Sequence, residues 1–395
     1  MPSWQMSAGP NTRPLELTPL RLSEARDKSL ILLQMTDTDN RLLWDVDFSL
    51  ALHNRTGKYH IGRDILASCS DLIGDVFYWR IKLAKPPTGL AARIIGRAAE
   101  WENRMEQLVP SVRPRRRRLH LDPLTSLSTR ICPEDAVLCH DLGPLTHPEL
   151  FPAKLPKLYA KAYARINRVQ PHMVFVSRAS RNHFKELYGV PRNARVIYPQ
   201  IRVGAVGGKL QPIAIAKKPF FLTVGSIGAR KNQINSMQAF TESGLADAGW
   251  SYMLCGALEP GSEEAISYAK SSKAIHVLPF VNDEELSWLY ANASAFVLTS
   301  RLEGFGMPVA EALAHGLTPM VAANSVLEEV AGEEAISVNE EDITSIAGGF
   351  TALAKLPDAS QHRARRKNQA LRFSREAFVS DWRNFLSGNS AAAGK

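Results

Sequence analysis

Cysteine, long apolar runs and an apolar leading segment are scarce or absent in this chain of 395 residues. Its cysteines, Cys69, Cys132, Cys139 and Cys255, form no C-x-x-C pair, which disfavours a disulfide framework or a zinc cluster. No apolar run approaches the roughly 18 residues of a membrane-spanning helix, and residues 1–20 lack the apolar core of a secretion signal. We therefore expect a protein of the reducing cytoplasm that buries its thiols.

The chain is long enough for two domains and apolar enough to fill their cores. Its 395 residues exceed one ordinary domain, and 45% of them are hydrophobic. From residue 220 onward, short apolar segments alternate with helical ones, which predicts a parallel sheet with right-handed crossovers. Residues 204–219 contain two adjacent glycines and two prolines, and this composition predicts a linker.

Apolar periodicity predicts the individual elements. Before the linker, strands are expected at residues 42–46, 76–79, 136–139, 173–176 and 195–198, and helices at 60–70, 90–107, 154–167 and 180–188. After it, strands are expected at residues 220–224, 251–254, 274–277, 295–298, 317–321 and 335–338. A final helix over residues 374–386 places Phe378, Trp382, Phe385 and Leu386 on one apolar stripe.

Two carboxylates, Glu303 and Glu311, bracket a glycine turn between a predicted strand and a predicted helix. Gly304 and Gly306 let backbone approach a ligand, Pro308 suits a helix start, and the helix N-terminus offers N–H groups to phosphate. The carboxylates cannot bind phosphate, but they can accept hydrogen bonds from hydroxyls. A nucleotide sugar, with its diphosphate between two hydroxyl-rich rings, meets both needs. The alternative is that Glu311, expected in the first helical turn, only complements the helix dipole, and that Glu303 is a solvated loop charge.

The stretch from Ser300 to Gly316 resembles the E-x7-E signature of the family 4 retaining glycosyltransferases, also described as group 1 glycosyltransferases. Other segments resemble the same family in the same order along the chain. They are residues 42–47, 55–60, 140–148, 176–180, 221–232, 277–286 and 325–332. The resemblance implies an α/β protein of the GT-B fold, in which two Rossmann-like lobes with parallel sheets face a central cleft.

The resemblance also implies a division of the chain. An N-terminal extension over residues 1–40 would precede an acceptor-binding lobe over 41–203 and the linker over 204–219. A nucleotide-sugar donor-binding lobe would occupy residues 220–373, and a helix over 374–387 would cross back to the first lobe. Residues 388–395 have the composition of a disordered tail.

Four residues are the expected catalytic set, Glu303, His140, Lys231 and Arg230. By resemblance, Glu303 contacts the transferred hexose, His140 points at the donor sugar, and Lys231 contacts the diphosphate. Breaking a glycosyl-phosphate bond adds negative charge to the leaving diphosphate, so nearby cations favour the reaction. A lone histidine after a strand can also be purely structural, and the Arg-Lys pair can be a solvated turn. Asp141 either bonds its own loop or orients His140.

A second set is expected to bind the donor. It comprises Gly57, Gly225, Ser226, Phe280, Val281, Gly304, Phe305, Gly306, Met307 and Glu311. The resemblance assigns the ribose to Glu311 and a close backbone approach to the diphosphate to Gly57. Many family members carry an arginine directly after the glycine that matches Gly225, whereas this chain has Ser226. The usual second cation is therefore missing at this position, and two alternatives stay open: Arg230 replaces it in part, or it has no replacement.

Two Asp-x-Asp triplets, Asp37–Asp39 and Asp45–Asp47, have the form of divalent-cation ligands beside a diphosphate. The second triplet lies at the first predicted strand, far in sequence from the diphosphate elements. Members of the resembled family generally need no metal. We therefore expect no metal and no cofactor, with the nucleotide sugar as a substrate.

The chain carries a net charge of +9, which favours an anionic partner. A basic cluster comprises Arg113, Arg115, Arg116, Arg117 and Arg118, with Arg93, Arg97 and Arg104 upstream. Basic segments gain about 1 kcal/mol per residue at an anionic membrane, so we expect contact with such a surface or with a lipid-linked diphosphate. The alternative is a solvated loop. No motif for specific nucleic-acid recognition is present.

The sequence thus predicts a retaining hexosyltransferase that uses a nucleotide-diphosphate sugar. The sequences of residues 55–57 and 224–232 resemble those of family members that transfer mannose or deoxyhexoses from GDP sugars. The expected acceptors are lipid-linked or saccharide molecules in polysaccharide or glycolipid assembly. We expect it in the cytoplasm, at the inner face of the membrane. Two alternatives are a nucleotide-sugar epimerase of similar double-lobed shape and a noncatalytic basic nucleic-acid-binding protein.

Overall fold

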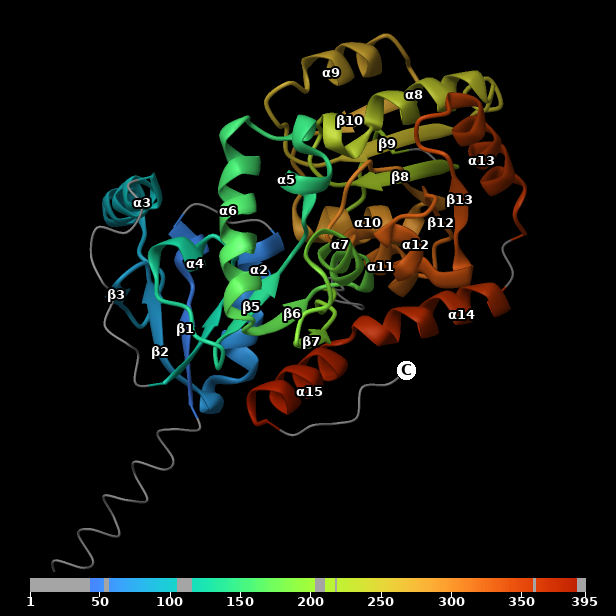
Figure 1. Ribbon diagram of the computed structural model, residues 1–395. Helices are drawn as coiled ribbons and strands as arrows, with labels where there is room; N and C mark the ends of the chain where they lie inside the picture. Colours follow the sequence, from blue (N-terminus) through green and yellow to red (C-terminus); the bar gives the residue numbers. More distant parts are fainter. Residues whose placement is uncertain are drawn as a thin grey trace, which may run out of the picture.

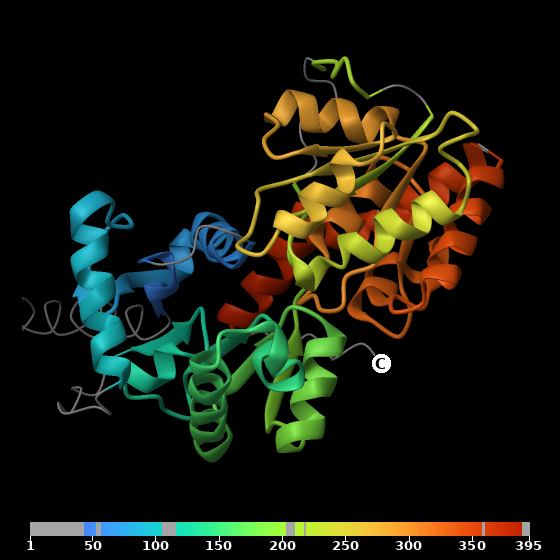
Figure 2. The ribbon, with the colours of Figure 1, turned by 90° about the horizontal axis from the view of Figure 1, so that it is seen from above.

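The computed structural model describes residues 43–52, 57–104, 116–202, 210–216, 219–357 and 360–388, with the side chains of 99–104 excepted. They form two α/β lobes that lie side by side (Figures 1 and 2). The predicted extension over 1–40, Arg113, Arg115, half of the linker and the tail from residue 389 lie outside the described residues. No helix in the described ranges combines the length and the apolar content needed to cross a bilayer.

The first lobe is built on a seven-stranded sheet in the order β3-β2-β1-β4-β5-β6-β7. Its strands are β1 (Trp44–Asp47), β2 (Ile73–Tyr78), β3 (Ile81–Lys82), β4 (Arg117–His120), β5 (Ala136–Cys139), β6 (His172–Phe175) and β7 (Asn193–Val196). Only β3 pairs antiparallel. The α-helices are α2 (Gly57–Ser68), α3 (Gly89–Arg104), α4 (Thr125–Ser128), α5 (Gly143–Thr146), α6 (Lys154–Val169) and α7 (Arg178–Tyr188).

The second lobe has a six-stranded parallel sheet in the order β10-β9-β8-β11-β12-β13. The strands are β8 (Phe220–Val224), β9 (Ser251–Cys255), β10 (Ile275–Leu278), β11 (Ala295–Leu298), β12 (Pro319–Ala322) and β13 (Ile336–Val338). All six strands predicted after residue 220 are present, with bounds that differ by at most two residues. The α-helices are α8 (Gln233–Glu242), α9 (Glu263–Lys270), α10 (Asp283–Asn292), α11 (Met307–Ala314), α12 (Val326–Ala331), α13 (Ile343–Lys355) and α14 (Ser360–Ala370).

The last helix, α15 (Arg375–Leu386), follows the second lobe in sequence but packs on the first. The indole Nε1 of Trp44 on β1 donates to the carbonyl oxygen of Leu386 over 2.8 Å. Arg383 forms a bidentate pair with Asp71, with both N–O distances at 2.7 Å. Because its apolar stripe is covered by the first sheet, α15 ties the second lobe back to the first.

Strand β4 corrects the prediction for the basic cluster, which the sequence placed on an exposed or solvated segment. Arg116 pairs with Asp45 over 3.2 Å, and the guanidinium of Arg117 stacks 4.4 Å above the Trp44 ring. Arg118 stacks 4.6 Å above the ring of Phe77. Arg117 and Arg118 begin β4, and Arg116 directly precedes it. All three arginines are half-buried, and their long side chains cover aromatic and acidic neighbours in the lobe.

Candidate active site

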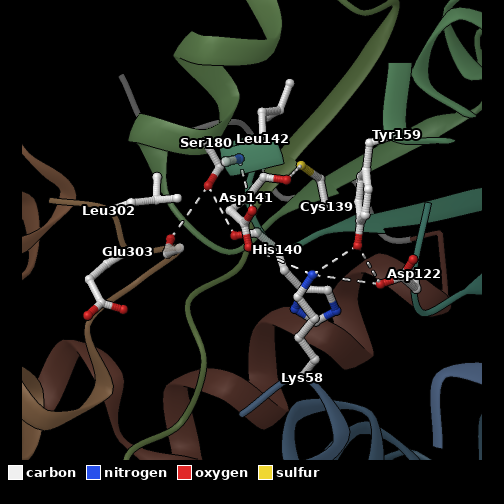
Figure 3. A network of polar contacts seen from close by, with 12 residues as sticks. Lys58, Asp122, Cys139, His140, Asp141, Leu142, Tyr159, Ser180, Leu302 and Glu303 are labelled. Atoms are coloured by element: carbon white, nitrogen blue, oxygen red, sulfur yellow. Dashed lines mark hydrogen bonds and ion pairs between the residues drawn. The ribbon is translucent and has the colours of Figure 1, made fainter. Parts of the chain in front are cut away.

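The two lobes meet where the loop after β11 lies against the loop after β5. A Cβ added to Gly304 would lie 2.5 Å from the carbonyl oxygen of His140, so only glycine permits this approach. The hydroxyl of Ser180, in the first turn of α7, donates to the carbonyl oxygen of His140 over 3.2 Å and contacts that of Gly304 over 3.5 Å. The predicted site residues of both lobes therefore come together at one junction (Figure 3).

Glu303 is a buried carboxylate surrounded by donors. Lys231 forms an ion pair with one carboxylate oxygen, Arg230 approaches the other over 3.3 Å, and the hydroxyl of Ser300 donates over 2.8 Å. Burial alone would raise the pKa of Glu303, but Lys231 and Arg230 hold it below the usual value, so the side chain is ionised at neutral pH. Glu303 is therefore not a solvated loop charge.

The two predicted cations come from the 3-10 turn η4 (Ala229–Lys231), beyond the end of β8. Lys231 is only 7% exposed, which excludes a solvated turn for this residue, and its ammonium lies 3.4 Å from where a Cβ on Gly225 would stand. Gly225 has a φ of +149°, which suits glycine. Ser226, at the position where many family members carry arginine, hydrogen-bonds to Glu259. Both cations contact Glu303 in this structure.

Glu311 lies in a different environment. It is the fifth residue of α11, in the second helical turn rather than in the first turn that the sequence suggested, so complementing the helix dipole does not explain it. Its carboxylate accepts a hydrogen bond from the hydroxyl of Tyr290 over 2.9 Å. Burial raises the pKa of Glu311 to about 7, while Tyr290 and Arg202 only partly counteract that rise.

The remaining predicted donor-binding residues divide into exposed and packed groups. Phe280, two residues after the end of β10 and next to Val281 in sequence, is 85% exposed, which suits a ring that a ligand can cover. Phe305 is buried, 5.1 Å from the ring of Phe373, and therefore holds the turn in place. Gly306 caps α11 with a φ of +99°, and Met307 begins that helix.

His140 follows β5 at the junction. Its Nε2 lies 2.9 Å from the carbonyl oxygen of Leu121, so Nε2 carries the proton. Among the described residues, the buried Nδ1 of His140 has no hydrogen-bond partner. Burial and the charge of Lys58 lower the pKa of His140 to about 4. The neighbouring Asp141 bonds its own loop through the backbone N–H of Gly143, over 2.9 Å.

Lys58 is a site residue that sequence reasoning missed. Gly57 was expected in a loop, but it is the first residue of α2, and Lys58 follows it in that helix. The ammonium of Lys58 lies 3.2 Å from the hydroxyl of Tyr159, 3.7 Å from Asp141 and 3.8 Å from Asp122 (Figure 3). A lysine beside the loop glycine was visible in the sequence, but its partners come from three other segments.

Glu329 was noticed only as part of a resembling segment, and the structure shows what it contacts. Its carboxylate on α12 accepts from the backbone N–H groups of Arg178 over 2.7 Å and Ala179 over 2.8 Å, and from the hydroxyl of Tyr198 over 2.9 Å. It thus joins the second lobe to the first turn of α7. A crevice of about 590 Å³ opens between α7 and α12, but none of the predicted catalytic or donor-binding residues lines it.

The acidic triplet on β1 has protein partners. Asp45 accepts from Arg116 and from the backbone N–H of Asp75, over 3.2 Å in each case. Asp47 accepts from the backbone N–H of Ser49 over 3.0 Å. In the ranges that the structure describes, no group of three or more metal-ligating side chains converges, and Asp37 and Asp39 lie outside those ranges.

Comparison with protein families identifies the lobe that carries both glutamates. Residues 210–372 match the family of glycosyl transferases group 1, a span that includes β8 to β13. The second lobe is a group 1 glycosyl transferase domain. Within this domain, Glu303 and Glu311 lie at the end of β11 and on α11, and Lys231 lies beyond β8. The predicted resemblance to this family is thereby confirmed for the second lobe.

Curated relatives of this chain are about one quarter identical to it over the aligned residues. O-antigen chain mannosyltransferase B of Escherichia coli is 27% identical over 60% of this chain and 66% of its own length. O-antigen chain mannosyltransferase RfbU of Salmonella typhimurium is 25% identical over 56% and 62%. MMP alpha-(1->4)-mannosyltransferase of Mycolicibacterium hassiacum is 26% identical over 52% of each chain. The chain therefore spans less than two thirds of the length of each of these relatives.

Solved structures confirm the predicted GT-B fold of the chain. Anabaena Alr3699/HepE in complex with UDP and glucose has a TM-score of 0.60 at 15% identity, over 88% of this chain and all of that one (100%). WaaG, a glycosyltransferase involved in lipopolysaccharide biosynthesis, has a TM-score of 0.54 at 14% identity, over 89% of this chain and 99% of that one. At these identities the likeness is one of fold.

Proposed function

We propose that this chain is a retaining hexosyltransferase that moves mannose or a related deoxyhexose from a nucleotide-diphosphate sugar, of the GDP-mannose type, to a saccharide or lipid-linked acceptor. The observation that carries the proposal is the cluster of Glu303, Lys231 and Arg230 at the interlobe junction, opposite His140. It supplies two cations for a diphosphate and a buried carboxylate for sugar hydroxyls. The names of the three curated relatives support mannose as the transferred sugar.

In the proposed reaction the diphosphate takes over the cations that Glu303 now occupies. A diphosphate carries more negative charge than one carboxylate, so it competes well for Lys231 and Arg230. Glu303 is then free to accept hydrogen bonds from hydroxyls of the sugar, and the unpaired Nδ1 of His140 accepts another. Binding of the nucleotide sugar would thus convert the site from one in which Glu303 is paired with the cations to one in which Glu303 contacts the sugar.

The transfer step follows from retention at the anomeric carbon. The acceptor oxygen forms a bond to the anomeric carbon on the face from which the diphosphate leaves. The electron pair of the broken carbon–oxygen bond goes to the diphosphate, which also takes the proton of the acceptor hydroxyl. Lys231 and Arg230 stabilise the added negative charge, the role that a metal ion has elsewhere, so we expect full activity in the presence of EDTA.

Two further contacts would hold the nucleotide. Glu311 would accept hydrogen bonds from the ribose hydroxyls, since its carboxylate has a single protein donor, Tyr290, among the bonds described. The exposed ring of Phe280 and the neighbouring backbone of Val281 would face the base. With these contacts the nucleotide would lie along the carboxyl ends of the second sheet, where ligands of parallel sheets bind.

We further propose that helix α3 contacts an anionic lipid surface at the inner face of the membrane. The side chains of Arg116, Arg117 and Arg118 are engaged within the lobe, so we assign this contact to α3 rather than to them. Leu90 and Ile94 are 72% and 60% exposed, and Arg93 and Arg97 beside them are exposed as well. Both ribbon views place α3 on the side of the first lobe away from the second (Figures 1 and 2). Basic and apolar side chains on one exposed helix suit an interfacial position.

Sedimentation with phosphatidylglycerol vesicles tests this surface. We expect the double variant Leu90→Glu/Ile94→Glu to bind at least about tenfold more weakly, because it removes apolar area and adds charge that the lipid repels. Leu187→Glu is the matched control, since Leu187 is also exposed but lies on α7. Equal binding by the α3 variant and this control would remove α3 from the membrane surface.

A thermal-shift panel of GDP-, UDP-, ADP- and dTDP-sugars tests the donor. We expect the largest stabilisation with GDP-mannose, followed by sugar transfer to a lipid-linked or oligosaccharide acceptor with the α-configuration retained, which NMR of the product reports. Conversion of the sugar without any acceptor would instead indicate an epimerase. Stabilisation by none of the four nucleotide classes would overturn the proposal.

A further inference from the structure

A partly buried lysine in the first lobe, Lys58, has no part in the chemistry described so far. Lys58 stands at the start of α2, one-quarter exposed, between the side chains of Asp122, Asp141 and Tyr159. These partners come from the loop after β4, the loop after β5 and helix α6, so a single ammonium joins four segments of the lobe. A charge this enclosed is costly unless it is paired, which explains the two carboxylates.

The same segments carry His140. Its Nε2 is committed to the carbonyl oxygen of Leu121, one residue before Asp122, and its Nδ1 has no partner in the described part of the protein. The charged groups that face the ring are Lys58 on α2, Asp122 after β4 and Asp141 on its own loop, with Tyr159 of α6 bonded to Lys58. Figure 3 shows these side chains around one point, with Glu303 of the other lobe nearby.

We propose that Lys58 is a positioning residue: by bridging Asp122, Asp141 and Tyr159 it holds the His140 loop in place and keeps the ring neutral, with Nδ1 as a free acceptor for a hydroxyl of the bound sugar. This inference rests on the proposed function. The ammonium offsets the two carboxylates, which would otherwise favour a protonated imidazolium. A protonated Nδ1 would be a donor and could no longer accept.

The pKa values agree with this geometry. Burial alone would lower the pKa of Lys58, but Tyr159, Asp141 and Asp122 raise it well above the usual value, so the ammonium stays charged. Burial and Lys58 together lower the pKa of His140 to about 4, against the opposing effect of both carboxylates. Removal of Lys58 therefore leaves those carboxylates to pull the pKa of His140 upward.

Nitrogen NMR of ¹⁵N-histidine-labelled protein tests the inference without any need for transfer activity. The His140 signal is identified by its loss in His140→Gln. We expect the neutral Nε2–H form down to about pH 5 in the natural chain and in the control Lys157→Met, which alters an exposed lysine of α6. In Lys58→Met the midpoint should rise by at least about one pH unit, since two carboxylates lose their counter-charge.

A second variant covers the case in which Lys58→Met does not fold. Lys58→Met/Asp141→Asn removes one of the two carboxylates and retains a side-chain oxygen that can accept from the backbone N–H of Gly143. Its His140 midpoint should lie above that of the natural chain and, where Lys58→Met folds, below that of Lys58→Met. The acid limb of kcat/KM for transfer should shift by the same interval as the NMR midpoint. A purely structural lysine would lower kcat/KM equally at every pH.

An unchanged His140 midpoint in both Lys58 variants would overturn the role of Lys58. Absence of transfer with every donor sugar would instead overturn the proposed function, and the NMR titration would still decide whether Lys58 controls the ring. The two failures are therefore distinguishable.

Discussion

The two glutamates of one motif end up in opposite surroundings. Glu303 lies among Lys231, Arg230 and Ser300, and its pKa is held low despite burial. Glu311, eight residues later, accepts a hydrogen bond from Tyr290 alone among the described residues, and burial raises its pKa to about 7. The motif places two carboxylates at the end of one sheet, but the cations of η4 keep Glu303 ionised, whereas burial favours the protonated form of Glu311. The difference suits the two tasks that we propose, catalysis beside the diphosphate and recognition of ribose.

Among the variants of the two glutamates and their partners, removal of Glu303 should have the largest effect on activity. Glu303→Ala is expected to lower kcat by at least about 100-fold, because the contact to the reacting sugar is lost. Nucleotide affinity should remain within a few-fold of the natural value or become tighter, since Lys231 and Arg230 lose the carboxylate that competes for them. Steady-state kinetics and calorimetric titration with GDP measure the two effects.

The control for this variant is Glu264→Ala, which removes an exposed carboxylate of α9. It should leave both quantities unchanged. Turnover of Glu303→Ala at the natural rate would exclude Glu303 from the reaction. A parallel collapse of GDP binding would show that Glu303 acts only by holding the fold of the cluster.

The cations of the same cluster should show a graded effect on binding. Lys231→Ala is expected to weaken GDP binding about 10- to 100-fold, the range for loss of one charge-assisted hydrogen bond. Arg230→Ala should have a smaller effect, because the Arg230 side chain is 29% exposed against 8% for Lys231 and water screens its charge more. Calorimetry with GDP compares the two, with Lys270→Ala of α9 as control, and equal GDP affinity in the natural chain and Lys231→Ala would count against the assigned role.

The smallest effect is expected at Glu311 and concerns stability. A carboxyl whose pKa rises from 4.5 to about 7 on folding keeps a proton that the unfolded chain has lost, so the folded state becomes less stable as pH increases from 4.5 to 7. Glu311→Gln removes this dependence. At pH 8 its Tm should exceed that of the natural chain by at least about 2 °C, and at pH 5 the two should agree.

Thermal unfolding at both pH values measures this difference, and Glu264→Gln is the matched control. A Tm gain that is the same at pH 5 and pH 8 would contradict the raised pKa of Glu311. Glu311→Gln should also bind GDP several-fold more weakly at pH 8, where the natural carboxylate accepts from ribose with full charge.

The second lobe was easier to predict than the first. Its strands are buried apolar runs between helices, and such runs are recognisable without knowledge of their neighbours. Strand β4 was missed because its sequence, Arg117–His120, has no apolar periodicity. Those arginines become strand residues only because Trp44, Phe77 and Asp45 lie beside them in the folded lobe.

The candidate site shows the same division. Glu303, Lys231 and His140 were found because each belongs to a short local pattern, although their roles in the reaction stay predictions. Lys58 lies in the resembling segment over residues 55–60, but its role was not predicted because its partners lie 64 to 101 residues away along the chain, at Asp122 and Tyr159. Contacts over such intervals depend on strand order, which the local sequence does not state.

By itself, the sequence determined the parallel sheet of the second lobe and the glycine turn between two carboxylates, because periodicity and spacing act over short stretches of chain. The resemblance of its motifs indicated the family of the second lobe. Only the tertiary structure decided that Glu303 holds both cations, that Glu311 has a raised pKa and that Lys58 lies between two carboxylates. Charge states and ion pairs depend on distance and burial in space, and these quantities exist only once distant segments have packed together.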